Sequence, residues 1–524
     1  LFTIGELTAI SRYCAEAAFG DSWSKVLMVE EPLRVLYVAS EVYPLAKTGG
    51  LGDVSSILPS TLRQLGVDAR LLMPGYSGVI DQIQGCPVTG SFPVLPDLEP
   101  VRLFRGILPE AAPGALTPVY VIHCPALYER SGGPYVDENG HDWLDNALRF
   151  AVLSKVAALF GSGAGLDGWR PHIVHCNDWQ TGLAPVYLAY DSQARARSVM
   201  SIHNLAFQGN FSPDLMPALG LPWSCFHHRG VEFYGHISYL KGGLYYSDRI
   251  LTVSRSYAVE IQTPEFGFGL EGLLVDCRDR LTGVLNGIDV SRWNPGTDPY
   301  LAVHYDVDDL HGKTQNKRLL QARMALDFEP DLPILALVTR LTYQKGVDLI
   351  LGVMEELLEQ PLQFVVLGSG DKNYEAQWRA LAENYPGRVG VAVGYDEGLA
   401  HLVEAGADLF LMPSRFEPCG LNQMYSMRYG TLPLVRRTGG LADSVVDTTP
   451  RSLVDGTATG FVFENANRSE LLACLLRALL LYGDRSVWRR VQCQGMRCDF
   501  SWASSAAHYL ELYLATDPFR RILV

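Results

Sequence analysis

Cysteine pairs spaced as Cys-x-x-Cys are missing from this sequence, although it contains 10 cysteines among 524 residues. Without that spacing a zinc or redox framework is not expected, and free thiols in a reducing compartment are favoured. No apolar run approaches the ~18 residues of a membrane-spanning helix, so we expect no membrane partner. The stretch 1–20 lacks the basic start of a signal peptide. The chain begins at Leu1 rather than Met, which leaves a removed targeting segment open.

A surplus of basic side chains is also missing. Lys and Arg number 43 against 57 Asp and Glu, which gives a formal net charge of −14 at pH 7. Nucleic-acid-binding surfaces are basic, so we expect no nucleic-acid partner, although a local basic pocket for an anion is compatible with this balance. The composition, 48% hydrophobic and 19% charged, is that of a globular chain, and the length predicts two or three domains.

Short apolar runs alternate with longer helical patterns along the chain. One series extends from 33–40 to 249–254, and a second from 332–339 to 460–464. The runs are rich in Val, Ile and Leu with little alternation, which is typical of parallel strands covered by helices on both faces. Patterns such as 347–360 predict the crossover helices. The predicted fold class is α/β, with two doubly wound Rossmann-like domains facing each other across a deep cleft.

The change from one strand series to the next suggests the domain boundaries. In doubly wound sheets ligands lie beyond the carboxyl ends of the strands, so the loops that follow strands are the informative ones. We expect four segments: an appendage at 1–32, a first domain at 33–284, a second domain at 285–498 and a final segment at 499–524.

The stretch KTGGLGDV, residues 47–54, follows the first predicted strand. Glycines let backbone N–H groups approach an anion, and a helix that begins near Gly52 would add its positive end. Lys47 is a mobile charge suited to phosphate. The spacing is neither that of a Walker motif nor G-x-G-x-x-G, and a glycine turn with a solvated lysine is the alternative interpretation.

Polar clusters follow two later strands of the first series, in HCNDWQTG (175–182) and HNLAFQG (203–209). Asp178 and Trp179 suit a hydroxylated ring, through hydrogen bonds and face contact. His203 suits a hydroxyl or carbonyl oxygen, although a packed structural histidine is the common alternative.

The second series carries cations after its first strand and a carboxylate near its fourth. Arg340 and Lys345 lie on one loop, where they suit a diphosphate leaving group. Tyr395 follows a later strand and could stack on a base. Glu417 precedes a helix whose start, at Gly420 and Leu421, would present N–H groups. A carboxylate beside a phosphate site suggests an acceptor for sugar hydroxyls, or a stabiliser of positive charge at an anomeric carbon.

Five motifs in order resemble the bacterial glycogen synthase and plant starch synthase family. They are KTGGLGDV, HNLAFQG, GVLNGID (283–289), TRLTYQKG (339–346) and SRFEPCGLNQMY (414–425). The resemblance extends from about Arg34 to Tyr513. It implies a GT-B glucosyltransferase that uses ADP-glucose, and a segment from 499 onward that crosses back to the first domain.

The resemblance also implies roles for single residues. Those assigned to catalysis are Glu417, His203, Lys345 and Arg340. Those assigned to the donor and its nucleotide are Lys47, Gly49, Gly50, Asp53, Asn286, Tyr395, Cys419, Gly420 and Leu421. Those assigned to the sugar or acceptor are Asp178, Trp179 and Asn204. Residue 177 departs from the family, because Asn stands where the pattern H-x-H-D-W has His, and we expect that change to lie behind the residues that contact the sugar.

The implied reaction transfers glucose, with retention, to the non-reducing end of an α-1,4-glucan. A retaining glycosidase needs two close carboxylates. Only Glu417 fits the sugar site here, which favours a front-face mechanism. We expect no metal and no pyridoxal phosphate, and interpret the Asp306–Asp308 pair as solvated. The compartment would be cytoplasmic in a bacterium, or the plastid stroma of a eukaryote after loss of a transit peptide.

Two alternatives stay open. One is a related GT-B transferase that uses UDP-glucose or another acceptor. The other is a non-catalytic glucan-binding protein, which should have lost Glu417, Lys345 or His203. Oligomeric state and the choice between glycogen and starch are not predicted.

Overall fold

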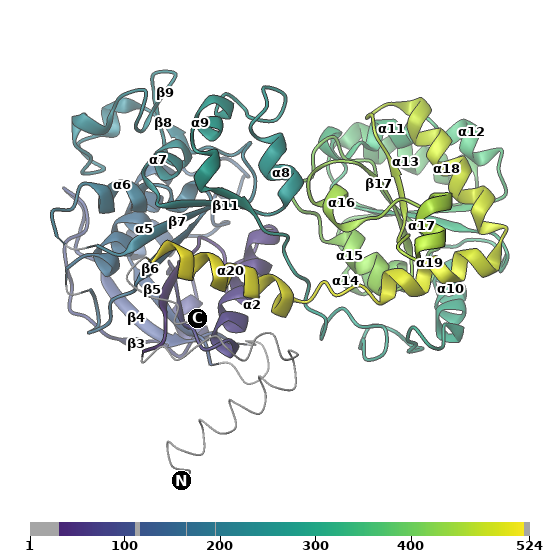
Figure 1. The fold of residues 1–524 in the computed structure, drawn as a ribbon, viewed down its shortest axis with the longest axis horizontal. Coiled ribbons are helices and arrows are strands. Elements are labelled where there is room, and N and C mark those ends of the chain that lie inside the picture. The colour runs from purple at the N-terminus through teal and green to yellow at the C-terminus, as the bar shows by residue number, and fades with distance from the viewer. Residues whose placement is uncertain (1–30, 110–115, 164, 194, 518–524) are drawn as a thin grey trace, which may run out of the picture.

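The computed structural model describes residues 31–109, 116–163, 165–193 and 195–517. It contains two α/β domains with separate sheets, the first parallel except at one edge and the second wholly parallel (Figure 1), which confirms the predicted fold class. The appendage expected at 1–32 lies outside the described residues, apart from its last two. Within the described ranges, no helix is both long and apolar enough to cross a bilayer.

The first domain is built on a nine-stranded sheet in the order β12-β11-β7-β6-β1-β2-β5-β4-β3. Its parallel strands are β1 (Arg34–Val38), β2 (Asp68–Pro74), β5 (Pro118–His123), β6 (Ile173–Asn177), β7 (Arg197–Ile202), β11 (Arg249–Thr252) and β12 (Leu281–Gly283). An antiparallel edge, β4 (Arg102–Ile107) and β3 (Cys86–Pro87), was not among the predicted strands. Half of β4 faces solvent, so it lacks the continuous apolar run that marked the others.

Helices cover both faces of this sheet. They are α2 (Gly50–Gln64), α3 (Val79–Gln82), α4 (Pro125–Tyr128), α5 (Asn146–Gly161), α6 (Leu183–Ala189), α7 (Tyr239–Tyr246), α8 (Arg255–Glu260) and α9 (Glu271–Asp276). A small antiparallel sheet of β8 (Asn210–Phe211), β10 (His236–Ser238) and β9 (Glu232–Phe233) joins the same domain. Single 3₁₀ turns connect elements at η1 (Trp179–Thr181), η2 (Pro213–Leu215), η3 (Trp223–Cys225) and η4 (Arg278–Arg280).

The second domain has a six-stranded, wholly parallel sheet in the order β15-β14-β13-β16-β17-β18. The strands are β13 (Ile334–Val338), β14 (Gln363–Gly368), β15 (Val389–Val393), β16 (Leu409–Met412), β17 (Leu432–Arg436) and β18 (Phe461–Phe463). The surrounding helices are α10 (His311–Arg323), α11 (Val347–Leu351), α12 (Met354–Leu358), α13 (Lys372–Asn384), α14 (Glu397–Gly406), α15 (Asn422–Arg428), α16 (Gly439–Ser444), α17 (Pro450–Asp455), α18 (Arg468–Tyr482) and α19 (Arg485–Met496), with η5 (Tyr343–Lys345) before α11.

The single helix expected over 347–360 is divided in the structure into α11 and α12. The break falls at Gly352 and Val353, where the glycine lacks a side chain to stabilise a continuous helix. Both halves still bury their apolar face, because Ile350, Met354 and Leu357 belong to one core cluster.

The last described helix, α20 (Trp502–Thr516), leaves the second domain and packs against α2 of the first (Figure 1). Trp502, Tyr509 and Tyr513 are buried in the same cluster as the strands of the first sheet. The hydroxyl of Tyr513 lies 2.7 Å from Nδ1 of His175 on β6. The chain therefore passes between the domains twice. On its second passage it completes the core of the first domain.

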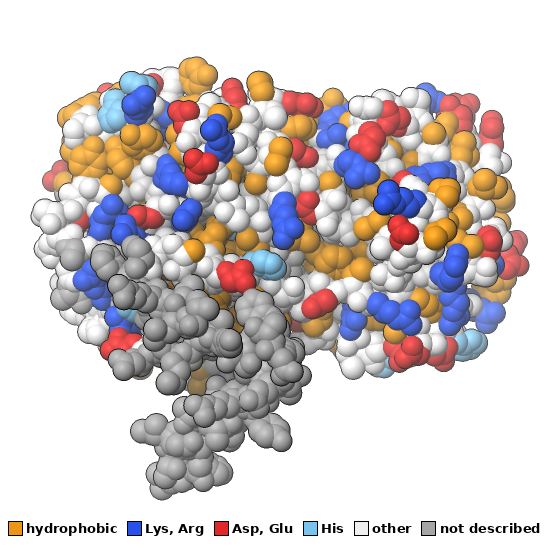
Figure 2. Space-filling model, viewed as in Figure 1, with side chains coloured by type: hydrophobic (Ala, Val, Ile, Leu, Met, Phe, Trp, Pro, Cys, Tyr) orange, Lys and Arg blue, Asp and Glu red, His pale blue; other side chains and the backbone are white. Residues whose placement is uncertain are grey.

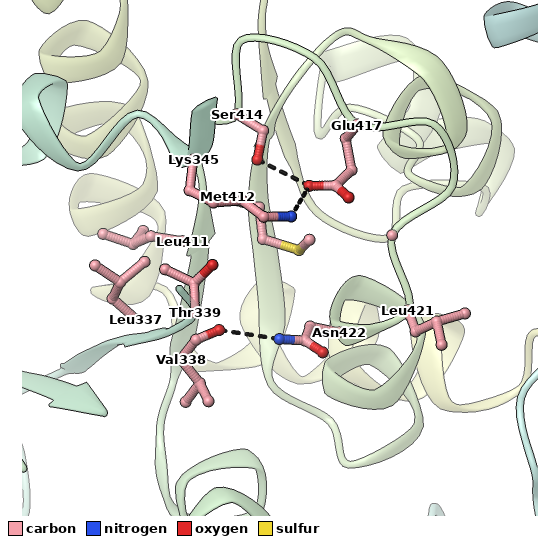
Figure 3. Close-up of a pocket in the computed structure, with 11 residues that line it drawn as sticks. Leu337, Val338, Thr339, Lys345, Leu411, Met412, Ser414, Glu417, Leu421 and Asn422 are labelled. Carbon is pink, nitrogen blue, oxygen red and sulfur yellow. Dashed lines mark hydrogen bonds and ion pairs between the residues drawn. The ribbon is translucent and has the colours of Figure 1, made fainter. Parts of the chain in front are cut away.

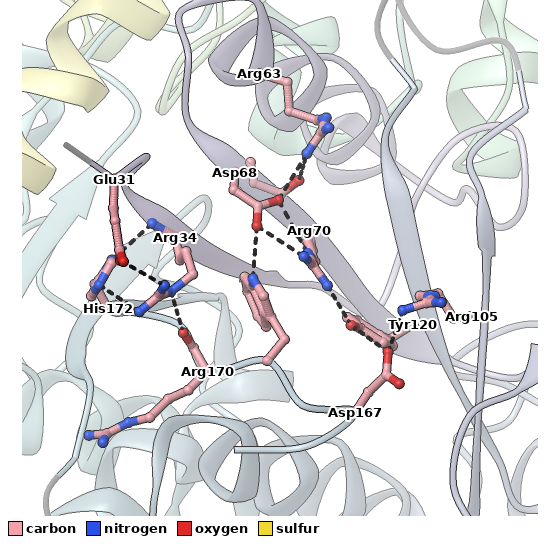
Figure 4. Close-up of polar contacts among 12 residues, drawn as sticks. Glu31, Arg34, Arg63, Asp68, Arg70, Arg105, Tyr120, Asp167, Arg170 and His172 are labelled. Atoms are coloured by element: carbon pink, nitrogen blue, oxygen red, sulfur yellow. Dashed lines mark hydrogen bonds and ion pairs between the residues drawn. The ribbon is translucent and has the colours of Figure 1, made fainter. Parts of the chain in front are cut away.

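A polar network closes the edge where β1, β2 and β5 begin (Figure 4). The carboxylate of Asp68 accepts hydrogen bonds from Trp169 Nε1 at 2.8 Å, from Arg70 at 3.0 Å and from Arg63 at 3.1 Å. Burial alone would raise the pKa of Asp68, but the hydrogen bonds from Arg70 and Trp169 outweigh it, so this pKa is lowered. The polar groups at the amino ends of these strands are therefore paired with one another. The carboxyl ends of the strands are left for the site.

Replacing Trp502 with Ala is expected to destabilise the first domain. The side chain is 5% exposed, and truncating a buried Trp costs about 3–5 kcal/mol. The urea midpoint of unfolding should fall, while Val454→Ala, at a side chain 86% exposed, should leave it unchanged. Equal midpoints for the two variants would contradict a structural role for α20.

Candidate active site

The glycine loop after β1 leads directly into α2, which begins at Gly50. Its N-cap residue, Gly49, is extended and provides no side-chain cap. A Cβ added at Gly49 or Gly50 would meet no atom within 4 Å, so packing of the chain does not require glycine there. Lys47 Nζ lies 2.7 Å from Asp53 Oδ1 in the first turn of α2. The loop thus presents backbone N–H groups at a helix start beside a lysine, an arrangement suited to an anion.

Glu41 holds this loop in place and was not predicted from the sequence. Its buried carboxylate accepts hydrogen bonds from Thr48 N at 2.5 Å, Thr48 Oγ1 at 2.7 Å and Gly49 N at 3.0 Å. A fourth comes from the hydroxyl of Tyr135, at 2.6 Å. These bonds use the Thr48 and Gly49 N–H groups, so the donors left for a ligand are those at the start of α2.

Asp178 and His203 lie together at the ends of β6 and β7. Asp178 has the left-handed φ of 55°, and its Oδ1 accepts from His203 N at 2.7 Å and Asn204 N at 3.4 Å. Burial raises the pKa of Asp178 to about 7, in spite of these two bonds. Burial also lowers the pKa of His203 to about 4. His203 is therefore neutral at pH 7.

Asn177 makes its contact with His203, a residue that the resemblance assigns to catalysis. Its Nδ2 donates to Val38 O at 3.0 Å, which leaves Oδ1 as the acceptor 3.0 Å from His203 Nε2. His203 Nε2 must then be the protonated nitrogen, since an amide oxygen cannot donate. The substitution of Asn for the expected His thus sets the tautomer of a predicted site residue.

Trp179 packs inside the first domain. Its ring lies 5.0 Å from Phe150, 5.7 Å from Phe211 and 6.2 Å from Tyr239, between ring centroids. Gly209 lies against the same indole, since a Cβ there would fall 2.3 Å from a ring carbon. Aromatic packing accounts for Trp179, and sugar contact through its remaining exposed edge stays a prediction.

The second-domain site is an ion pair on two neighbouring strand ends (Figure 3). Lys345 Nζ lies 2.5 Å from Glu417 Oε2, and Ser414 Oγ donates to the same oxygen at 3.0 Å. Asn422 Nδ2 donates to Val338 O at 3.0 Å and anchors the start of α15. A cavity of about 80 Å³ lies here, lined by Leu337, Val338, Thr339, Lys345, Leu411, Met412, Ser414, Glu417, Gly420, Leu421 and Asn422.

The other predicted second-domain residues differ in exposure. The guanidinium of Arg340 makes no hydrogen bond or ion pair with the described residues, and Tyr395 is 82% exposed. Asn286 is buried, and its Oδ1 has no hydrogen-bond partner in the described chain. Burial raises the pKa of Cys419 to about 12, in spite of hydrogen bonds from Asn286, so burial favours the neutral thiol.

The two domains touch beside these residues. Ser254 Oγ donates to Pro418 O at 2.6 Å, next to Glu417. Glu260 on α8 accepts from Gly439 N at 2.8 Å at the start of α16. The ring of Tyr43 lies 5.5 Å from Lys47 Nζ and 5.2 Å from the guanidinium of Arg292. Sequence reasoning missed the two hydrogen bonds between the domains, whose partners lie 164 and 179 positions apart in the chain.

The Asp306–Asp308 pair builds a turn. Asp306 Oδ1 accepts from Asp308 N at 2.9 Å and Asp309 N at 3.0 Å, and Asp308 is 86% exposed. Among the described residues, no group of three or more His, Cys, Asp or Glu is placed to hold a metal ion.

The imidazole of His203 is expected to titrate near pH 4, because burial lowers its pKa from 6.5. The unfolded chain binds this proton more tightly, so the stability from this group is complete above about pH 6.5 and is lost as the pH falls toward 4. Histidine NMR, with His203→Gln to assign the signal, measures the midpoint. A midpoint near 6.5 would show that the ring is solvated.

Family models match both domains. The model described as starch synthase catalytic domain matches residues 34–276, and glycosyl transferases group 1 matches residues 321–490. The chain is 51% identical to the glycogen synthase of Nitrosospira multiformis over 92% of this chain and 97% of that one. It is 50% identical to the glycogen synthase of Nitrosomonas eutropha, over 92% and 96%.

Solved structures agree. The catalytic domain of starch synthase IV from Arabidopsis thaliana, bound to ADP and acarbose, has a TM-score of 0.81 and 32% identity, and covers 93% of this chain and 100% of that one. Sucrose-phosphate synthase from Thermosynechococcus elongatus, at 15% identity and a TM-score of 0.55, shares the fold alone. The chain is therefore a GT-B glycosyltransferase that belongs to the glycogen and starch synthase family.

Proposed function

We propose that this glycosyltransferase moves glucose from ADP-glucose to the 4-hydroxyl at the non-reducing end of an α-1,4-glucan, with retention at the anomeric carbon. The observation that carries the proposal is the Lys345–Glu417 pair, at the start of α15 and beside the contact with the first domain. The ADP and acarbose bound to the related starch synthase IV support the same two ligand classes.

The diphosphate is proposed to bind between the two domains. Lys345 and Arg340 approach from the second domain, and the Gly49–Gly50 loop with Lys47 approaches from the first. Lys345 Nζ forms an ion pair with Glu417 Oε2 at 2.5 Å, and Lys47 Nζ forms one with Asp53 Oδ1 at 2.7 Å. An entering diphosphate supplies stronger acceptors, so each ammonium exchanges a carboxylate for a phosphate.

The other predicted residues are proposed to surround the nucleotide and the glucose. Asp53, Asn286 and Tyr395 serve the nucleotide or donor, and the exposed ring of Tyr395 is free to stack on a base. The transferred glucose is contacted by His203, Asn204, Asp178 and Trp179 from the first domain, and by Glu417, Cys419, Gly420 and Leu421 from the second.

Retention is proposed to follow a front-face course. A double displacement needs a second carboxylate as nucleophile, but Asp178 is held by two backbone N–H groups and burial raises its pKa to about 7. The leaving phosphate accepts the proton of the attacking hydroxyl, while Lys345 and Arg340 stabilise its charge. Glu417 and the backbone carbonyl near His203 stabilise the oxocarbenium-like transition state.

The scheme includes neither a metal ion nor pyridoxal phosphate. The cations Lys345, Arg340 and Lys47 neutralise the departing diphosphate, the task for which other phosphate-transferring sites use Mg²⁺. Turnover in the presence of EDTA therefore tests the role of these side chains.

Glucan elongation should proceed with ADP-glucose in EDTA and be slower with UDP-glucose. Nucleotide release and growth of a glycogen primer are measured side by side for both donors. A preference for UDP-glucose would support the first alternative, a related GT-B transferase that uses that donor. No turnover with either donor, together with retained glucan binding, would support the non-catalytic alternative.

Glu417→Gln should lower kcat about 10²–10³-fold, because it removes the charge that faces the anomeric carbon while keeping the shape. Lys345→Gln should have a similar effect, because it removes a cation from the leaving group. Glu464→Gln and Lys372→Gln, at side chains 62% and 86% exposed, serve as matched controls. Activity of Glu417→Gln within threefold of wild type would contradict the assigned role.

A further inference from the structure

A second concave site lies on the second domain, between the end of α17 and the outer face of α19. It is open to solvent on one side and has a volume of about 520 Å³, within the range of small-molecule sites. Its lining shares no residue with the Lys345–Glu417 cavity. We name it the α19 cavity; it is lined by Ser452, Leu453, Gly456, Ala458, Ser486, Arg489, Arg490, Val491, Cys493, Gln494 and Arg497.

The charges in the α19 cavity are all positive. Arg489, Arg490 and Arg497 line it, and no Asp or Glu does. The stretch Arg485–Cys498 contains four arginines and no acid, in a chain whose net charge is −14. Figure 2 shows Lys and Arg side chains in blue over the part of the second domain where Figure 1 labels α10 and α19.

Two of these arginines are free to bind a ligand. Arg489 and Arg490 are exposed and make no hydrogen bond or ion pair with the described residues. Arg497 has only a distant partner, Asp308, at 4.0 Å. By contrast Arg485, one turn earlier and outside the cavity, donates to Asp331 O at 2.9 Å and stacks on Tyr482. Within Arg485–Cys498, the arginines without a hydrogen bond or ion pair to the described residues are therefore Arg489 and Arg490, and both line the cavity.

The lining indicates the chemistry of the ligand. Three guanidinium groups in a lining that contains no acid match a phosphate dianion, which accepts paired N–H donors. Leu453, Ala458 and Val491 add an apolar wall for the body of an organic molecule. No aromatic side chain lines the cavity, so the stacking platform that a neutral glucan would use is missing from its described lining.

We propose that the α19 cavity binds a small phosphorylated metabolite, with Arg489, Arg490 and Arg497 on the phosphate and the apolar wall against the carbon skeleton. The site is distinct from the donor site. Gln492 Nε2, on the buried face of the same helix, donates to Gly430 O at 2.7 Å, just after α15, and Met496 packs on Gly430. The ligand would thus bind one helix away from α15, whose start carries Gly420 and Leu421.

Ribose 5-phosphate tests the proposal as a small phosphorylated sugar, and because the same group is part of ADP, Lys345→Gln controls for binding at the donor site. Its binding is measured by calorimetry against inorganic phosphate and ribose. Wild type and Lys345→Gln should bind ribose 5-phosphate equally, within about twofold. Arg489→Gln/Arg490→Gln should bind it at least tenfold more weakly. Arg379→Gln/Arg451→Gln removes the same charge from side chains 55% and 92% exposed, outside the cavity, and should bind as wild type.

Unchanged thermal unfolding of the Arg489→Gln/Arg490→Gln protein shows that it is folded, since both side chains are exposed. Wild-type affinity in that variant, or loss of binding in Lys345→Gln alone, would overturn the assignment by moving the ligand elsewhere. Absence of binding to wild type would overturn it outright. Equal affinity for inorganic phosphate would overturn the role of the apolar wall.

Discussion

The ion pair between Lys345 and Glu417 is the contact around which the second-domain site is arranged. Its partners come from the loops after β13 and β16, adjacent strands of the sheet, so the pair joins two loops as well as two charges. Gly346 permits this approach: its φ is +69°, and a Cβ there would fall 2.2 Å from Pro413 O. Both charged groups are largely buried, so removing either one leaves the other as a buried charge without its ionic partner. The loss of folding free energy is then larger than the net stabilisation that the pair provides.

The first domain repeats this arrangement with different residues. Lys47 forms an ion pair with Asp53. Glu41 orders the loop between these two residues by accepting hydrogen bonds from Thr48 and Gly49, and it also accepts one from Tyr135. Each domain therefore holds a cation beside a carboxylate before any anion is bound. Such a site would need little rearrangement to accept the proposed diphosphate, because each cation is already in place and only its acceptor would change.

Much of this architecture is readable from the sequence because it depends on local signals. Unbroken Val, Ile and Leu runs mark strands buried on both faces, and glycine-rich or charged loops after them mark the site. The antiparallel β4 was missed because solvent on one face removes that signal. Glu41 and Ser414 were missed for another reason: a single acidic or hydroxyl residue in a loop carries no pattern, and its role appears only when the fold supplies Tyr135 or Glu417 as a partner. Likewise the sequence shows Asn177 only as a departure from the family pattern. In the structure its Oδ1 accepts a hydrogen bond from His203 and fixes the tautomer of that ring.

The return of α20 to the first domain affects the order in which the chain can fold during synthesis. A ribosome releases residues 33–284, and then the whole second domain, before Trp502, Tyr509 and Tyr513 emerge. Until then the face of α2 and β6 that these side chains cover, including His175, is open to water. The domain made first is thus finished last, and its early form exposes apolar surface of the kind that chaperones recognise.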